Sequence, residues 1–80
     1  MQNPKRLTVK DVLEIIYSDT WVQLFDDDIC RVVEEGYAEE MLRGGTRWGN
    51  FRILDIEGRS IADTACKDPY THCIMVNFCE

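Results

Sequence analysis

Residues 8–34, TVKDVLEIIYSDTWVQLFDDDICRVVE, decide the fold because a helical pattern changes to a strand pattern within this stretch. Apolar residues at helical spacing predict a helix over residues 9–17. Residues 20–25 and 29–34 are rich in β-branched and aromatic side chains, which favour strands. The aspartates between the two strands predict a turn, so this part of the chain is expected to form an antiparallel hairpin.

The rest of the chain repeats this order of elements. Residues 37–43 contain strong helix formers, with acidic residues early and a basic residue late, and Gly44 is expected to cap the helix. Residues 51–56 and 73–79 have strand composition, and the alternation of apolar residues is clearest in the second run. The chain is therefore expected to be an α+β domain of order αββαββ. It would have a small antiparallel sheet of about four strands, one main helix and one short helix.

We expect the helices to cover one face of the sheet and to leave the other face free. Thr8 and Asp11 have the spacing of a capping box, which marks the start of the first helix. The residues that should form the core share an inward position on these elements: Val12, Leu13, Ile16, Val22, Leu24, Val32, Met41, Leu42, Ile53, Ile74, Val76 and Phe78.

The length of 80 residues suits one domain, expected over residues 7–80, with a flexible N-terminus at residues 1–6. Fifteen acidic and nine basic residues give a formal net charge of −6. This charge opposes binding to duplex nucleic acid or to an anionic membrane and favours a basic partner. No apolar run reaches the length of about 20 residues that spans a bilayer, and no secretory signal is evident, so a cytoplasmic location is expected.

The four cysteines could form two disulfides in a secreted protein, but the expected compartment favours free thiols. Cys66, His72, Cys73 and Cys79 lack the paired spacing of a zinc site, so no metal or other cofactor is expected. If the strand begins there, His72 and Cys73 point to opposite faces and cannot act as a catalytic pair. His72 with Cys66 remains an alternative, but nothing in their spacing favours it over a surface histidine. A non-enzymatic role is therefore expected.

The free face of the sheet is the first candidate binding site. Trp21 and Phe25 are expected there with Met75, and grouped aromatic and Met side chains favour a protein interface. The acidic turn would lie at its edge. The expected contact residues are Trp21, Phe25, Met75, Asp26, Asp27 and Asp28. In the alternative, this face is covered by residues 57–72 or by self-association as a homodimer.

The stretch from Arg43 to Arg52 is the second candidate site. Arg43, Arg47 and Arg52 could bind phosphate and Trp48 could stack on a base, as in a protein that binds or sequesters a nucleotide signal. In the alternative, this stretch is a flexible connection in which Trp48 closes the edge of the core.

Residues 7–16, LTVKDVLEII, and residues 35–42, EGYAEEML, followed by a closing pair of strands, resemble small uncharacterised proteins of phages and mobile elements of Gram-positive bacteria. The loop around Trp48, the 57–72 segment and the cysteines depart from that group. The resemblance implies an interaction role in a bacterial host, such as inhibition of an immune protein. The partner would be a larger bacterial protein with a basic surface.

Overall fold

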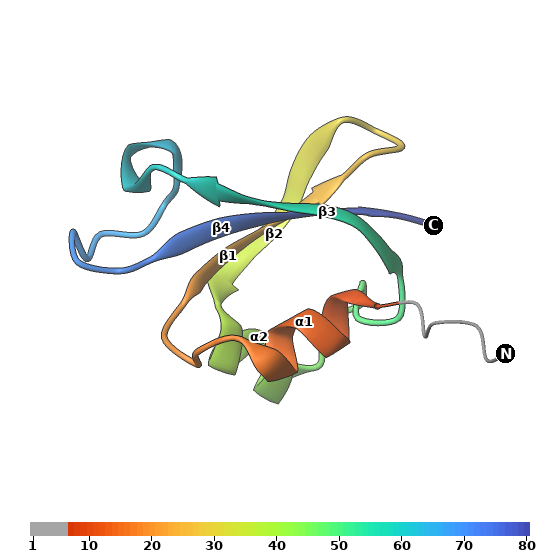
Figure 1. Cartoon of the computed structure of the whole chain (residues 1–80), viewed down its shortest axis with the longest axis horizontal. Helices are drawn as coiled ribbons and strands as arrows, with labels where there is room; N and C mark the ends of the chain where they lie inside the picture. The colour runs from red at the N-terminus through yellow and green to blue at the C-terminus, as the bar shows by residue number, and fades with distance from the viewer. Residues whose placement is uncertain (1–6) are drawn as a thin grey trace, which may run out of the picture.

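The computed structural model describes residues 7–80, and the expected flexible N-terminus lies outside this range. The α+β class and the order αββαββ are confirmed (Figure 1). Between the last two strands the chain adds a short 3-10 helix. The elements are α1 (Val9–Ile15), β1 (Trp21–Asp26), β2 (Arg31–Tyr37), α2 (Ala38–Gly44), β3 (Arg52–Arg59), η1 (Ile61–Asp63) and β4 (Cys73–Cys79).

The four strands lie in the order β2-β1-β4-β3. The β1–β2 and β3–β4 pairs are antiparallel, but β1 and β4 are parallel, so the expectation of a fully antiparallel sheet was wrong for the central pair. After β2, the chain passes through α2 and a loop to the opposite edge of the sheet, where β3 begins. β4 then fills the centre beside β1. This crossover determines the direction of the central pair.

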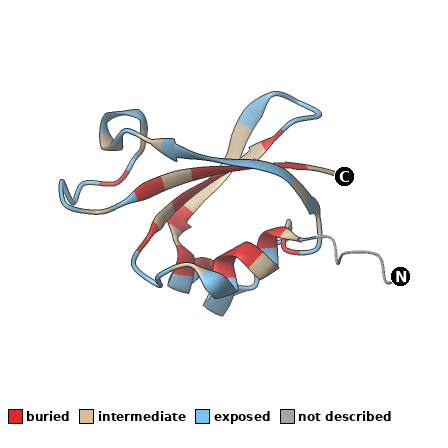
Figure 2. Cartoon of the chain, viewed as in Figure 1, coloured by how far each residue is buried: buried red, intermediate tan, exposed pale blue. Residues whose placement is uncertain are grey.

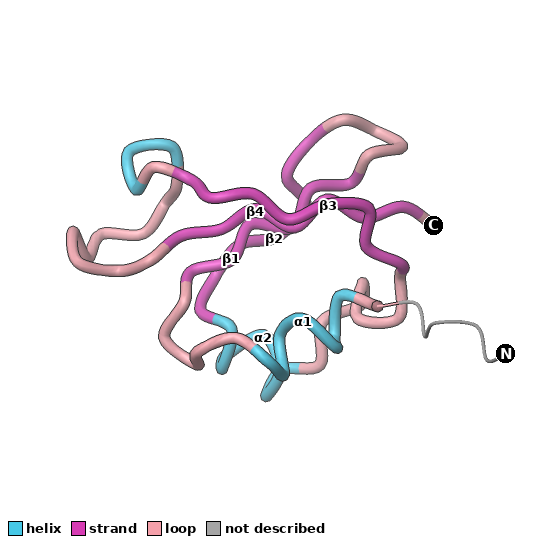
Figure 3. Tube along the Cα trace, viewed as in Figure 1, coloured by secondary structure: helices cyan, strands magenta, loops and turns pink. Residues whose placement is uncertain are grey.

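Both helices lie on one face of the sheet, so the domain has two layers (Figure 3). The side chains buried between the layers come from both helices and from the two central strands (Figure 2). They are Val9, Val12, Leu13, Val22, Leu24, Ala38, Met41, Val76 and Phe78. Among residues 7–80, no helix is long and apolar enough to cross a membrane.

Two predicted core residues lie elsewhere. A register shift pairs Leu24 with Glu34 but Phe25 with Val32, so Val32 shares the face of Phe25, and Val33 packs against the core instead. Leu42 is 36% exposed because α2 turns Met41 toward the sheet. Ile16, Ile53 and Ile74 are partly buried against the core, whereas Val9 and Ala38 are buried core residues that were not predicted.

The ends of the helices differ slightly from the prediction. The capping box is confirmed: the backbone N–H of Asp11 donates to Thr8 Oγ1 at 3.3 Å, and the N–H of Thr8 donates to Asp11 Oδ2 at 2.9 Å. α1 ends at Ile15, two residues early, which leaves Tyr17 83% exposed. The expected difference between a main and a short helix is absent, since both have seven residues. α2 is capped by Gly45 rather than Gly44, because its φ of 68° is the left-handed conformation that glycine adopts readily.

Candidate functional site

The chain itself covers part of the expected docking face. Met75 is only 8% exposed, and Trp21 is half-buried with its Nε1 donating to Glu35 Oε1 at 2.9 Å. The 60–72 segment lies against this end of the sheet, where Gln23 Nε2 donates to the carbonyl oxygen of Asp63 at 3.1 Å. The chain's own 60–72 segment therefore covers the sheet face at the Trp21 end, as in the alternative given above.

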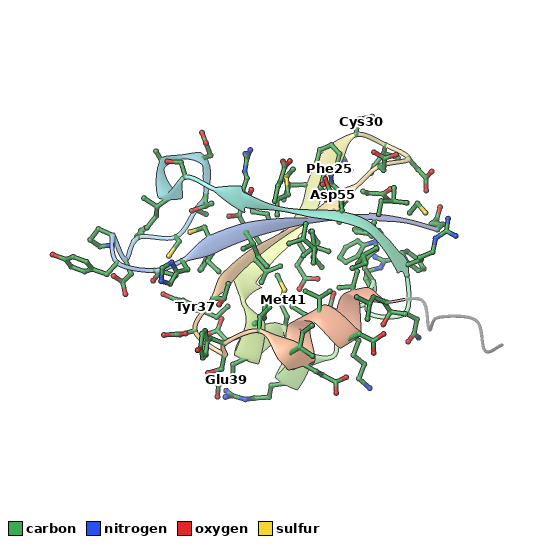
Figure 4. The ribbon with its side chains drawn as sticks, viewed as in Figure 1. Phe25, Cys30, Tyr37, Glu39, Met41 and Asp55 are labelled. Atoms are coloured by element: carbon green, nitrogen blue, oxygen red, sulfur yellow. The ribbon has the colours of Figure 1, made fainter. Side chains whose placement is uncertain are left out.

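The other expected contact residues lie at the opposite end of β1. Phe25 is half-buried and, with Asp55, lies on the side of the sheet away from the helices (Figure 4). Asp27 and Asp28 are exposed in the hairpin turn. Asp26 is buried at the end of β1, and its Oδ1 accepts a hydrogen bond from the backbone N–H of Asp28 at 2.9 Å. The expected residues therefore do not form one continuous exposed surface.

The arginines of the second candidate site do not converge. Arg43 forms an ion pair with Glu39 at 2.6 Å on the surface of α2. Arg47 lies over the Trp48 ring, 5.2 Å from its centroid. Arg52 extends from β3, where its Nη2 lies 3.6 Å from the Sγ of Cys79. Three separate positions cannot hold one phosphate group.

Trp48 is half-buried and packs against Phe78, with ring centroids 6.3 Å apart. It therefore closes the edge of the core, as the alternative for this loop states. A hollow of about 350 Å³ beside Arg47 is also lined by Glu34 and Glu40. Two carboxylates next to one guanidinium oppose the binding of a phosphate.

A different site lies at the end of the sheet where β1 begins and β2 ends. A hollow of about 400 Å³ there is lined mainly by carboxylates and tyrosines, and Figure 4 shows two of these residues, Tyr37 and Glu39, where β2 leads into α2. Its polar and aromatic lining includes Asp19, Glu39, Glu40, Asp68, Tyr37 and Tyr70. This combination suits a cationic side chain, because carboxylates attract it and aromatic faces stabilise it.

A second hollow of about 490 Å³ adjoins the first at His72, which lines both. Its other walls are mostly apolar and include Ile15, Tyr17 and Ile74. Ile15 is 73% exposed. Exposed apolar side chains grouped around a hollow are typical of interaction sites. The two hollows together are called the end groove below.

Backbone hydrogen bonds hold the parts of the end groove together. The N–H of Ala38 donates to the carbonyl of Thr20 at 2.9 Å, and the N–H of Glu39 donates to the carbonyl of Ser18 at 3.1 Å. These bonds fix the turn after α1 to the first turn of α2. The N–H of Trp21 donates to the carbonyl of His72 at 2.9 Å, which fixes the loop before β4 to the start of β1.

The outer wall of the end groove is a turn at residues 68–71, which contain an Asp-Pro pair. The N–H of Thr71 donates to the carbonyl of Asp68 at 3.2 Å, and the N–H of Tyr70 donates to Asp68 Oδ1 at 3.0 Å. Tyr70 is 91% exposed. Its ring is therefore available to a molecule that enters the groove.

The charges around the acidic hollow are unbalanced. Within residues 7–80, no Lys or Arg side chain lines it, although Arg43 pairs with the outer carboxylate, Glu39. The pKa of the Tyr37 hydroxyl is raised: its hydrogen bond with Thr71 acts to lower it, but the contact with Cys66, partial burial and the nearby charges outweigh that effect. The tyrosine is therefore neutral at neutral pH, and the negative charge comes from the carboxylates.

Among residues 7–80, no group of three or more His, Cys, Asp or Glu side chains has a metal-binding arrangement. The carboxylates instead line the walls of a space large enough for a side chain. The end groove can therefore hold an organic cation beside an apolar group.

The sequence contains little signal for this site. Its acidic residues are Asp19, Glu39, Glu40 and Asp68. They are far apart in the sequence, and only folding of the chain brings them together. The apolar part depends on the early end of α1, which exposes Tyr17. The exposed aromatic residue in the Asp-Pro-Tyr turn was a signal that sequence reasoning could have used.

No known protein family, curated protein or solved structure matches the chain.

Proposed function

We propose that this protein is a non-enzymatic binding module that docks on a larger protein through the end groove. The partner segment presents a Lys or Arg side chain next to a large apolar side chain. The observation that carries the proposal is the contact between the two hollows at His72, one acidic and aromatic and the other apolar. A basic partner also agrees with the net charge of −6.

Charge and apolar contact have separate roles in this proposal. The carboxylates of Asp19, Glu40 and Asp68 attract and orient the basic side chain, whereas burial of the apolar side chain against Ile15 and Tyr17 supplies most of the affinity. Exposed charge pairs contribute about 0.2–1 kcal/mol each and weaken with salt. Affinity should therefore fall as the ionic strength rises but should not disappear.

Isothermal titration with short synthetic peptides tests the proposal. The first peptide carries an Arg-Leu pair in a neutral sequence, and matched peptides replace the Arg with Gln or the Leu with Ser. We expect the Arg-Leu peptide to bind most tightly and both replacements to weaken binding. If none of the peptides produces heat, or if the three bind equally, the proposal is wrong.

Variants of the protein locate the binding site. Asp19→Asn with Glu40→Gln removes two carboxylates from the groove and should weaken binding by about two- to thirtyfold, the effect of two exposed charge pairs. The control, Asp55→Asn with Glu57→Gln, changes the net charge equally on β3 and should leave the affinity unchanged. Equal losses for both variants would show that the net charge alone attracts the peptide.

A second pair of variants tests the apolar hollow. Tyr17→Ser should weaken binding by about tenfold, because the peptide loses a large apolar contact. Ile29→Ser is the control, because it removes an apolar side chain that is 51% exposed in the hairpin turn, away from the groove. Loss of binding in Ile29→Ser but not in Tyr17→Ser would place the contact on the hairpin instead.

The narrower form of the proposal is inhibition of a bacterial immune protein by a phage-encoded module, and its support is the sequence resemblance described above. Production of the protein in bacteria that carry such a system should restore phage plaques. The double variant Asp19→Asn, Glu40→Gln should restore fewer plaques than the natural protein. Equal plaque numbers with and without the protein, across several immune systems, would contradict this form.

A further inference from the structure

Cys66 and Cys73 lie at the two ends of the loop that forms the outer wall of the end groove. Cys73 is the first residue of β4, and Cys66 lies in the 60–72 segment that crosses the sheet. Both are buried, with Cys66 8% exposed and Cys73 7% exposed, and both are free thiols. Asp68, Tyr70 and His72, which line the groove, lie between them.

The hydroxyl group of Thr64 lies between the two cysteines. Thr64 Oγ1 accepts a hydrogen bond from the backbone N–H of Cys66 at 3.2 Å and lies 3.9 Å from the Sγ of Cys73. Burial raises the pKa of the Cys73 thiol, and the charge and hydrogen bonding of the neighbouring Cys66 side chain raise it further. Independently of these pKa effects, the contacts of Thr64 Oγ1 place the backbone of Cys66 and the thiol of Cys73 beside the same hydroxyl group.

The remaining cysteines lie elsewhere in the fold. Cys30 is exposed in the β1–β2 hairpin turn, and Cys79 is at the far end of β4 beside Arg52. The hairpin turn and the 60–72 segment rise from opposite ends of the sheet (Figure 1). Cys30 and Cys79 are thus internal controls for reaction at the Cys66–Cys73 pair.

We infer that Cys66 and Cys73 are a redox-active dithiol that forms a reversible disulfide with glutathione disulfide as the oxidant. The Cys66 thiolate attacks glutathione disulfide, forms a mixed disulfide and releases one glutathione thiolate. The Cys73 thiolate then attacks Cys66 Sγ, which forms the internal S–S bond and releases the second glutathione. The two thiols lose two protons and two electrons, and glutathione disulfide is reduced to two molecules of glutathione.

The disulfide would fix the outer wall of the groove. It would join the two ends of residues 67–72 and hold Asp68 and Tyr70 in place before a partner arrives. This consequence rests on the proposed function. Because preorganisation reduces the ordering cost of binding, oxidation should tighten binding of the Arg-Leu peptide by roughly two- to tenfold.

Mass spectrometry of the full chain tests the disulfide itself. The protein is equilibrated with defined ratios of glutathione to glutathione disulfide, quenched in acid, alkylated and digested with trypsin. Before alkylation, the intact mass should fall by about 2 Da, the loss of two hydrogen atoms. Cleavage after Lys67 should yield residues 60–67 linked to residues 68–80. The variant Cys30→Ser, Cys79→Ser removes ambiguity about the partner of Cys66 and should give the same linked peptides.

Cys66→Ser and Cys73→Ser should each abolish the link, and Cys66→Ala is a second choice if a serine variant is unfolded by circular dichroism. Absence of the linked peptides at every ratio, or a link from Cys66 to Cys79 in the natural chain, would overturn the inference. A link that leaves peptide affinity unchanged would overturn its regulatory part. If no peptide binds in either redox state, the proposed function is wrong. Mass spectrometry still shows whether the disulfide forms.

Discussion

The Glu35 side chain on β2 accepts a hydrogen bond from the backbone N–H of Ala65, 30 residues further along the chain, at 2.8 Å. The same oxygen, Oε1, also accepts from Trp21 Nε1 and, at 3.4 Å, from Gln23 Nε2. Gln23 in turn accepts a hydrogen bond from Arg59 Nε at 3.2 Å. One carboxylate therefore joins the 60–72 segment to the sheet and supports the outer wall of the end groove.

Replacement of this carboxylate should release the segment. Glu35→Gln should lower the free energy of unfolding by about 1.5–3 kcal/mol, the range for hydrogen bonds to a charged group, because the neutral amide cannot serve three donors equally. Urea unfolding measures this change, and hydrogen exchange of residues 60–66 should become faster. Glu57→Gln, an exposed change on β3, is the control and should stay within about 0.5 kcal/mol. Similar losses in both variants would contradict the role of Glu35.

The pKa of Glu35 gives a dependence on pH. Burial acts to raise this pKa, but the hydrogen bonds from Ala65, Trp21 and Gln23 outweigh it, so the folded value lies below the ordinary value of 4.5. The stabilisation is therefore complete above that value and is lost as the pH falls through the lower folded pKa. Trp21 fluorescence should change in this acidic range in the natural chain but not in Glu35→Gln. The same transition in both proteins would contradict the assignment.

The core should respond to a loss of volume according to burial. Leu24 is fully buried and Leu42 is 36% exposed, so the same substitution can be compared at both sites. Leu24→Ala should cost about 2–5 kcal/mol, whereas Leu42→Ala should cost less than about 1 kcal/mol. Thermal and urea unfolding provide the measurement. A larger cost at Leu42 would mean that α2 packs on the sheet through a different face.

The end of α2 offers two adjacent glycines with opposite expectations. Gly45→Ala should cost about 1–2 kcal/mol because the φ of 68° is unfavourable for any residue with a Cβ atom. Gly44→Ala should instead stabilise the protein by about 0.5–1 kcal/mol, since it lies in the helix and an added Cβ has no neighbour within 4 Å. Chemical unfolding measures the stability of both variants. Equal changes in the free energy of unfolding would mean that the helix is not capped at Gly45.

Local patterns predicted the local structure well. The Thr8–Asp11 capping box, the aspartate turn and the core-facing positions of β4 depend on neighbouring residues, and each is present in the structure. The parallel pairing of β1 with β4 could not be predicted this way, because strand composition does not specify the neighbouring strand. The end groove was harder still to predict. Met75 has the pattern of an exposed position but is only 8% exposed, whereas Tyr17 continues the helical pattern but is 83% exposed.

Nuclear magnetic resonance titration of the ¹⁵N-labelled protein with the Arg-Leu peptide shows whether the peptide occupies the end groove. We expect the amide signals of residues 17–20, 37–40 and 68–72 to shift together and saturably, because these segments form the end groove. Shifts concentrated in the hairpin turn at residues 26–31 or along β3, with these three segments unchanged, would contradict it.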